Sequence, residues 1–261
     1  MRYPDFDSVL GILRDRMRTA PIVKTERWQG LDTSKKPEAA THELMNVFFT
    51  VPVPTTEPDF LAEQVKPNLP WADMHFAERV CGQPLNPPPS WKHWPWGHSA
   101  SNFLDARGQF NHTYPERFWP KQANVKPESV TADNWGIRYR YGDLGDVLDL
   151  LEREPLTRQA FLPVWFPEDT GAAHRDRTPC TIGYHFMVRQ NKLHCFYYIR
   201  SCEFVRHFRD DIYLAVRLQL WVLEQLTKRS ERWLGVQPGD FAMHIGSLHM
   251  FVNDHRQEFG S

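Results

Sequence analysis

Residues 180–200, CTIGYHFMVRQNKLHCFYYIR, form two apolar runs rich in aromatic and β-branched side chains, separated by the polar pair at 190–191. This pattern predicts two strands joined by a turn at that pair. Residues 211–228 follow with apolar side chains at helical spacing, which predicts a long helix soon after the second strand. Asp210 and Asp211 are expected to cap that helix. The stretch therefore predicts part of a sheet with a helix directly beside it in the chain.

Segments with the same two periodicities surround this unit. Helical spacing predicts helices over 5–18, 71–80 and 142–154, and apolar β-rich runs predict strands over 43–54, 158–167 and 239–254. The chain has no internal repeats, and the order of its elements predicts an α+β fold with a mixed β-sheet. Its 261 residues are expected to form one domain, 1–261.

Residues 82–135 interrupt this regular pattern. The prolines of GQPLNPPPSWKHWPW exclude helix and strand there, because they lack a backbone donor and fix φ. Long loops inside a compact domain are usually functional or disordered, and the tryptophans of this one favour an ordered segment. We therefore expect an aromatic- and proline-rich insertion that serves the function of the protein.

The bulk composition excludes several classes of protein. The net charge is -1 and the pI about 6.9, so no basic field attracts nucleic acid. No apolar run is long enough to span a bilayer, and the N-terminus lacks the apolar region of a signal peptide. The 4 cysteines fit neither a metal-binding spacing nor a disulfide framework. These features predict a reduced cytoplasmic protein without a metal, a membrane anchor or a nucleic-acid partner.

Charge is concentrated in RSCEFVRHFRDD, residues 200–211, directly after the second strand. Desolvated ions are costly unless they pair with each other or with a ligand. Arg200 and Ser201 together suit a phosphate, with a fork of donors beside a hydroxyl, although a surface ion pair is the simpler alternative. Asp211 could act in a site or only cap the helix.

Three further residues are candidates for chemistry, each with a structural alternative. Cys180 follows a proline close to Arg175 and Arg177, cations that would lower the pKa of its thiol; a structural cysteine is the alternative. Glu78 lies among apolar residues of a helix, where a half-buried carboxylate could transfer protons and an exposed one would only be solvated. His249 lies in an apolar strand and could simply be a core histidine.

Read together, these segments resemble the thymidylate synthase family. The resemblance rests on EPLTRQ, a strand containing Trp165, TPC, RSCE twenty residues after the cysteine, LGVQPGDF and GSLH, which span roughly residues 143–254. It implies a thymidylate synthase-like fold in which a mixed sheet is flanked by helices. It also implies that one face of the sheet forms a homodimer interface.

The resemblance implies a role for each matching position. Cys180 would add to C6 of a pyrimidine nucleoside monophosphate, and Glu78 would position water and relay protons. Arg200 and Ser201 would hold the 5′-phosphate, and Arg158 would reach the phosphate of the neighbouring subunit. The remaining assignments are His249 near the sugar 3′-hydroxyl, Glu203 at the folate co-substrate 5,10-methylenetetrahydrofolate, and Arg27 as a further phosphate contact.

Two departures from the family pattern indicate the branch. Threonine follows the cysteine at Thr181 where the family has histidine, and Asp211 stands where the family has an asparagine that reads uracil. A carboxyl that shares a proton with N3 and accepts from N4–H matches cytosine instead. The sequence therefore resembles the dCMP 5-hydroxymethylase branch, in which the C5 carbanion equivalent takes up the one-carbon unit and water completes a 5-hydroxymethyl group.

Other departures leave alternatives open. Phe251 replaces a tyrosine that contacts the sugar, so CMP remains an alternative to dCMP, and Gln159 replaces a second phosphate arginine. A dCMP methyltransferase, a dUMP hydroxymethylase, a thymidylate synthase or a non-catalytic nucleotide-binding homologue are further alternatives. The chain ends soon after VND, so we expect either a lid from the Trp-rich insertion or a wetter closed state. A viral origin would place the enzyme in the host cytoplasm.

Overall fold

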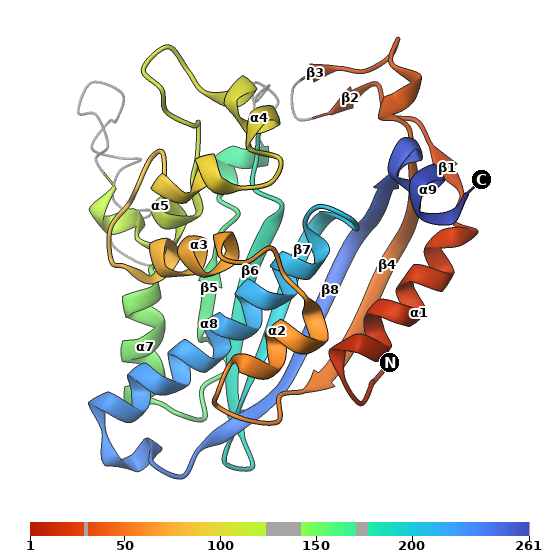
Figure 1. The fold of residues 1–261 in the computed structure, drawn as a ribbon. Coiled ribbons are helices and arrows are strands. Elements are labelled where there is room, and N and C mark those ends of the chain that lie inside the picture. Colours follow the sequence, from red (N-terminus) through yellow and green to blue (C-terminus); the bar gives the residue numbers. More distant parts are fainter. Residues whose placement is uncertain (29–30, 124–141, 171–176, 261) are drawn as a thin grey trace.

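A six-stranded mixed sheet forms the centre of the protein. The computed structural model describes residues 1–28, 31–123, 142–170 and 177–260 (Figure 1). The strand order is β1-β4-β8-β7-β6-β5, with β7 and β8 parallel and the other neighbours antiparallel. The strands are β1 (Ile22–Val23), β4 (Thr41–Pro52), β5 (Phe161–Pro163), β6 (Thr181–Arg189), β7 (Lys192–Glu203) and β8 (Gln237–Phe251). A separate two-stranded sheet joins β2 (Arg27–Trp28) to β3 (Leu31–Asp32). The predicted α+β class with a mixed sheet is confirmed.

Helices cover one face of this sheet. Figure 1 shows α1, α2 and α8 in front of the strands. The described helices are α1 (Phe6–Arg18), α2 (Asp59–Val65), α3 (Trp71–Val80), α4 (Gly97–Ala100), α5 (Tyr114–Phe118), α7 (Leu144–Arg153), α8 (Phe208–Arg229) and α9 (Val252–Phe259). The predicted helices over 5–18, 71–80 and 142–154 therefore exist with almost the expected bounds. Strand β5 is much shorter than the expected 158–167, and α9 replaces the end of the strand expected to reach 254.

The hairpin of β6 and β7 follows from the sequence that predicted it. Side chains alternate between buried and partly exposed along both strands, and Arg189 pairs with Lys192 across the turn. Gln190 and Asn191 have φ values of 51° and 58°. Two successive residues with positive φ match the twist of the flanking strands, which is the usual way to close a two-residue hairpin.

Helix α8 begins earlier than expected, and this changes the role of the two aspartates. The helix starts at Phe208 after His207, so Asp210 and Asp211 lie inside its first turn rather than capping it. Asp210 accepts hydrogen bonds from the backbone N and the Nδ2 of Asn68, each at 2.8 Å. The expected capping role is therefore wrong: one aspartate anchors a neighbouring loop, and the other is left for a different partner.

The described part of the insertion, 82–123, is ordered by aromatic contacts and a buried ion pair. The Trp91 and Phe110 rings meet edge to face at 5.7 Å. Arg117 of α5 forms a bidentate pair with Asp169 at 2.8 and 2.9 Å. These contacts support the expectation of order here, and the rest of the predicted insertion, 124–135, lies outside the described residues.

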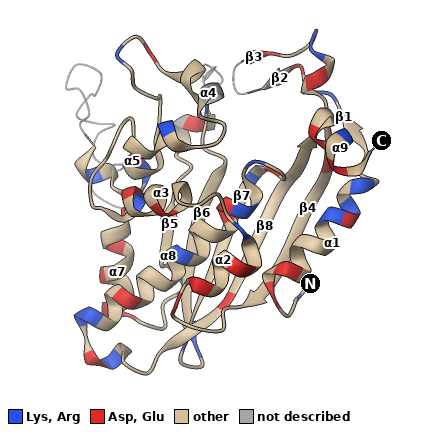
Figure 2. Ribbon diagram, in the orientation of Figure 1, with Lys and Arg blue, Asp and Glu red and all other residues tan. Residues whose placement is uncertain are grey.

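The second face of the sheet carries no described helix and exposes apolar side chains. Phe48 of β4 and Ile182 of β6 are 50% and 42% exposed. In Figure 2, acidic and basic residues are interspersed along the helices, whereas the strands are mostly uncharged. None of the helices in the described ranges is long and apolar enough to cross a membrane.

Candidate active site

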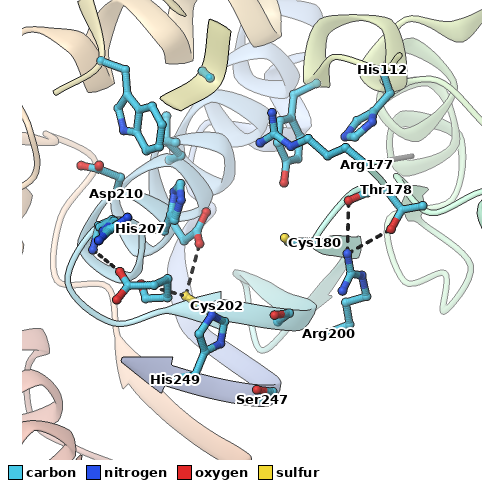
Figure 3. Close-up of a pocket in the computed structure, with 18 of the residues that line it drawn as sticks. His112, Arg177, Thr178, Cys180, Arg200, Cys202, His207, Asp210, Ser247 and His249 are labelled. Atoms are coloured by element: carbon cyan, nitrogen blue, oxygen red, sulfur yellow. Dashed lines mark hydrogen bonds between the residues drawn. The ribbon is translucent and has the colours of Figure 1, made fainter. Parts of the chain in front are cut away.

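A cavity of about 760 Å³ opens at the end of β7 that leads into α8. Its lining comes from α3, the insertion, the loop before β6, the ends of β7 and β8, and the first turn of α8. Six of the residues singled out from the sequence line it together: Cys180, Arg200, Ser201, Glu203, Asp211 and His249. Figure 3 shows Cys180 and Arg200 on one side of the cavity and His207 and Asp210 on the other. The fold thus brings these six residues together around one cavity, although they are up to 69 positions apart in the chain, from 180 to 249.

Cys180 lies on the loop just before β6, held against the C-terminal part of β7. Its carbonyl accepts a hydrogen bond of 2.9 Å from the backbone N of Arg200. Burial raises the pKa of the thiol, while the charges of Arg200 and Arg177 act in the opposite direction. The pKa of Cys180 is thus raised, whereas the sequence predicted that it would be lowered, because the cost of desolvating a thiolate outweighs the effect of two nearby cations. Arg175, the other expected cation, lies outside the described residues.

Arg200 holds the loop that carries this cysteine. Its Nε donates to the carbonyl of Pro179 at 2.9 Å, and its Nη2 donates to the carbonyl and hydroxyl oxygens of Thr178 at 3.2 and 3.0 Å (Figure 3). The guanidinium also lies 5.3 Å from the ring centroid of Trp165. Nη1 has no hydrogen-bond partner among the described residues and remains for a ligand beside Ser201.

Asp211 presents a carboxyl group to the cavity from the first turn of α8. The thiol of Cys202 donates to its Oδ2 at 3.3 Å. Burial raises the pKa of Asp211 to about 7, and the charge of Arg79 and the Cys202 hydrogen bond oppose that rise. Near neutral pH this carboxyl therefore exists in both protonation states. It can donate a proton or accept one, which an asparagine in its place could not do.

Glu203 and His249 lie together at the ends of two paired strands. Glu203 is only 5% exposed; its Oε2 accepts from the backbone N of Arg206, and its Oε1 has no hydrogen-bond partner. Burial raises the pKa of Glu203 to about 7, with Arg206 opposing. His249 is the register partner of Glu203 across the parallel pair, and burial lowers its pKa. The site thus holds a buried carboxyl with one free oxygen.

The comparisons with known proteins agree on one family. The family model described as thymidylate synthase matches residues 88–258, well over half of the sequence. The chain belongs to the thymidylate synthase family. A solved structure, the thermostable thymidylate synthase A from Bacillus subtilis, is similar with a TM-score of 0.64 at 16% identity, covering 99% of this chain and 84% of that one. The likeness to that structure establishes the thymidylate synthase fold. Members of the family transfer a one-carbon unit from methylenetetrahydrofolate to pyrimidine nucleoside monophosphates.

Two described residues expected to act in a thymidylate synthase-type site, Glu78 and Arg158, do not line the cavity, and a third cannot be placed. The Glu78 carboxylate accepts from the backbone N of Ser90 at 2.5 Å and from its hydroxyl, and it lies 3.5 Å from Nδ1 of His75. Arg158 is exposed just before β5 and is not among the residues that line this cavity. Arg27 belongs to β2, and its side chain lies outside the described part of the structure.

Sequence reasoning missed the wall of the site that α3 provides. Trp71, His75 and Arg79 recur every fourth residue, so they share one face of the helix, and all three line the cavity. The rings of Trp71 and His75 stack at 4.9 Å, and Trp94 stacks on His207 at the same distance. The four-residue spacing of a tryptophan, a histidine and an arginine was the available signal. It was missed because the apolar residues of this segment indicate an ordinary helix packed on the core.

Proposed function

We propose that the protein is a dCMP 5-hydroxymethyltransferase that converts dCMP, 5,10-methylenetetrahydrofolate and water to 5-hydroxymethyl-dCMP and tetrahydrofolate. Cys180 is the nucleophile that forms a covalent bond to C6 of the base. The observation that carries the proposal is Asp211: a carboxyl with a pKa of about 7 that lines the same cavity as Cys180.

The chemistry of Asp211 favours cytosine. Protonated Asp211 donates to N3 of cytosine while its other oxygen accepts from the N4 amino group. Donation from Cys202 to Oδ2 favours Oδ2 as the accepting oxygen and Oδ1 as the oxygen that carries the proton. In this arrangement uracil would place its O4 carbonyl oxygen against the accepting Oδ2 of Asp211. Two buried acceptors that face each other without a proton between them are costly. The proton given to N3 also offsets the negative charge that builds on the ring when the thiolate adds.

The phosphate contacts follow from the same region. Nη1 of Arg200 and the hydroxyl of Ser201 suit a 5′-phosphate, since both line the cavity beside Cys180. Arg158 of the partner subunit and Arg27 complete this set in the proposal, and His249 contacts the sugar. Phe251, also in the lining, offers no hydroxyl to the sugar of either nucleotide, so the preference for dCMP over CMP rests on Ser201, which resembles the deoxynucleotide enzymes.

The residues present fit a folate co-substrate. The free Oε1 of buried Glu203 can hydrogen-bond to a polar ring edge, and the indole rings of Trp71 and Trp94 give the cavity an aromatic wall. When bound, methylenetetrahydrofolate supplies the one-carbon unit. In the proposal Glu78 orders water through its contacts with His75 and Ser90, rather than from the cavity surface.

A homodimer is part of this proposal. The exposed apolar face that includes Phe48 and Ile182 suits a second copy of the chain, because soluble monomers rarely leave such a surface uncovered. Arg158 is exposed directly before the edge strand β5. In the proposed dimer its side chain enters the cavity of the partner subunit.

Mass spectrometry of the product from a mixed pool of CMP, dCMP and dUMP tests the proposal, with methylenetetrahydrofolate present. The expected product is dCMP with a hydroxymethyl group, formed with release of tritium from C5-labelled dCMP. A hydroxymethyl group on CMP, or a methyl group on dCMP or dUMP, would contradict the proposal and identify the protein as the enzyme that makes that product instead. No tritium release from any of the three nucleotides would indicate a binding protein. Cys180→Ser, which removes the nucleophile, serves as the matched control.

A further inference from the structure

Arg79 is a buried cation in the wall of the cavity with no carboxylate partner. It is 4% exposed, and the described residues include no acid within ion-pair distance of it. Its Nη2 meets Nε2 of His75 at 3.1 Å, its guanidinium lies 4.0 Å from the ring centroid of Tyr114, and its Nε has no hydrogen-bond partner. A buried charge without a counter-ion is strongly destabilising. The protein therefore tolerates Arg79 at a cost, which points to a role in the site.

A chain of contacts behind the cavity wall sets the orientation of this guanidinium. Glu78 is held by Ser90 and lies next to Nδ1 of His75. Since Nε2 of His75 accepts from Arg79, the ring proton is on Nδ1 and faces Glu78 and Ser90. Burial and the charge of Arg79 lower the pKa of His75 to about 4, so the ring remains a neutral acceptor at physiological pH. Glu78, His75 and Arg79 thus form one line that ends at the cavity.

We propose that Arg79 is a positioning residue for Asp211: held by the Glu78–His75 line, its charge lets the Asp211 carboxyl share its proton with the substrate base instead of retaining it. The inference deepens the proposed function and rests on Asp211 as the group that reads cytosine. It gives the Glu78 network a purpose in the site.

The groups around Asp211 make Arg79 the source of this effect. Four parts of the fold supply the titratable and charged groups that interact electrostatically with Asp211. They are its own helix with Asp210, β7 with Cys202 and Tyr197, the beginning of β6 with Cys180 and Tyr184, and the wall formed by the insertion and α3 with Tyr114 and Arg79. Arg79 is the one cation among them. The hydrogen bond from Cys202 acts in the same direction as Arg79 but carries no charge, and the charge of Asp210 acts in the opposite direction.

Loss of the Arg79 charge therefore has a defined direction. A carboxyl in a buried site without a nearby cation has a higher pKa, because the charged form loses its stabilisation. The proton would then stay on Asp211 at pH values at which the wild-type protein shares or releases it. A residue with only a packing role would not move this titration.

The test is the ¹⁵N chemical shift of N3 in protein-bound [3-¹⁵N]dCMP, followed between about pH 5 and 9. This signal reports whether N3 shares a proton, and it needs neither turnover nor folate. Wild-type protein should give one titration, which Asp211→Asn abolishes. Arg79→Gln and the more apolar Arg79→Met should move its midpoint to higher pH by roughly one unit or more. Arg79→Lys, which keeps the charge, should leave the midpoint within a few tenths of a unit.

A matched control is Arg177→Met, which removes a different cavity arginine that acts on Cys180 and not on Asp211; its midpoint should equal that of the wild type. An unchanged midpoint in both Arg79→Gln and Arg79→Met, with dCMP still bound, overturns the inference but leaves the proposed function intact. Failure of the wild-type protein to bind dCMP at saturating concentration overturns the proposed function instead. Equal shifts in the lysine, glutamine and methionine variants would show that packing, not charge, is responsible, and would also overturn the inference.

Discussion

Asp210 and Asp211 are neighbours in the first turn of one helix, yet they serve different purposes. Asp210 is 2% exposed and is bound by the backbone and side chain of Asn68. Asp211 faces the cavity and has a pKa near 7, and within the described part of the chain its carboxyl accepts only from the weak thiol donor of Cys202. Successive residues of a helix point about 100° apart, so one carboxyl supports the loop before α3 while the other is available to a ligand.

Asp211→Asn is expected to reverse the base preference. An amide cannot lose or share a proton, and in the family's usual orientation it accepts from N3–H of uracil and donates to O4. The ratio of kcat/KM for dCMP to that for dUMP should fall by about 100-fold or more. Asp210→Asn is the matched control: it should lower thermal stability without changing the ratio. Retention of the dCMP preference in Asp211→Asn would contradict the assigned role.

Glu203 is expected to make the free energy of unfolding depend on pH. Its pKa is raised from 4.5 to about 7 in the folded protein. Between these values the folded chain keeps a proton that the unfolded chain has lost, so stability falls as pH rises through this window. Glu203→Gln should therefore be more stable than wild type above about pH 7, by roughly 1–3 kcal/mol. Denaturant unfolding at about pH 5 and pH 8 measures this, and the gain should shrink at the lower value. A gain of equal size at both pH values would point to packing instead.

At the scale of elements, the cavity depends on how the insertion is tied to the sheet. Arg117 of α5 and Asp169 bury a bidentate ion pair, and Asp169 also accepts from the backbone N of Phe166 at 2.8 Å. This joins the segment that carries Tyr114 to the loop that approaches Cys180. Helix α5 is too short to be stable alone, so this pair and the capping box of Thr113 and Glu116 hold it in place.

Arg117→Met is expected to cost roughly 3–5 kcal/mol of stability, because it leaves the Asp169 carboxylate buried without its partner. Thermal or denaturant unfolding gives the value. The double variant with Asp169→Asn should recover part of the loss, since an amide is less costly to bury than an ion. Equal stability of the single and double variants would contradict an ion-pair origin. The single variant should also bind dCMP more weakly, because Tyr114 lines the cavity.

At the scale of the whole molecule, the uncovered face of the sheet predicts an obligate pair of subunits. Size-exclusion chromatography with light scattering should give about 61 kDa, twice the 30.7 kDa of one chain. Ile182→Lys, a charge in the middle of the apolar face, should shift the protein towards monomer. A wild-type mass near that of a single chain would refute the dimer.

The proposed cross-subunit role of Arg158 is testable by mixing two inactive variants. Arg158→Ala and Cys180→Ser should each have little activity, because one lacks a phosphate contact and the other the nucleophile. After subunit exchange, mixed dimers contain one site with both residues intact, so about a quarter of wild-type activity should return. Absence of recovery in a mixture shown to exchange subunits would place Arg158 in its own subunit's site or in none.

Local pattern determined much of this protein. The strand–turn–strand unit of residues 180–200 and the helices over 5–18 and 71–80 were readable from spacing, because β-alternation, helical periodicity and turn preference are local properties. The family came from the resemblance of the motif order to the thymidylate synthases, and the family model confirms it. The same reading found Cys180, Arg200 and Asp211, since each stands beside a predicted element boundary.

Only the tertiary structure decided what surrounds these groups. It placed Glu78 behind His75, brought Arg79 to the cavity, and raised the pKa of Cys180 where the local cations predicted the opposite. Burial and electrostatic fields depend on residues far apart in the chain, such as 79 and 211, and no local pattern encodes how closely folding brings them together. The sequence alone indicated several of the chemical groups in the site; the tertiary structure added the residues of α3 and decided the environment of all of them, and with it their protonation.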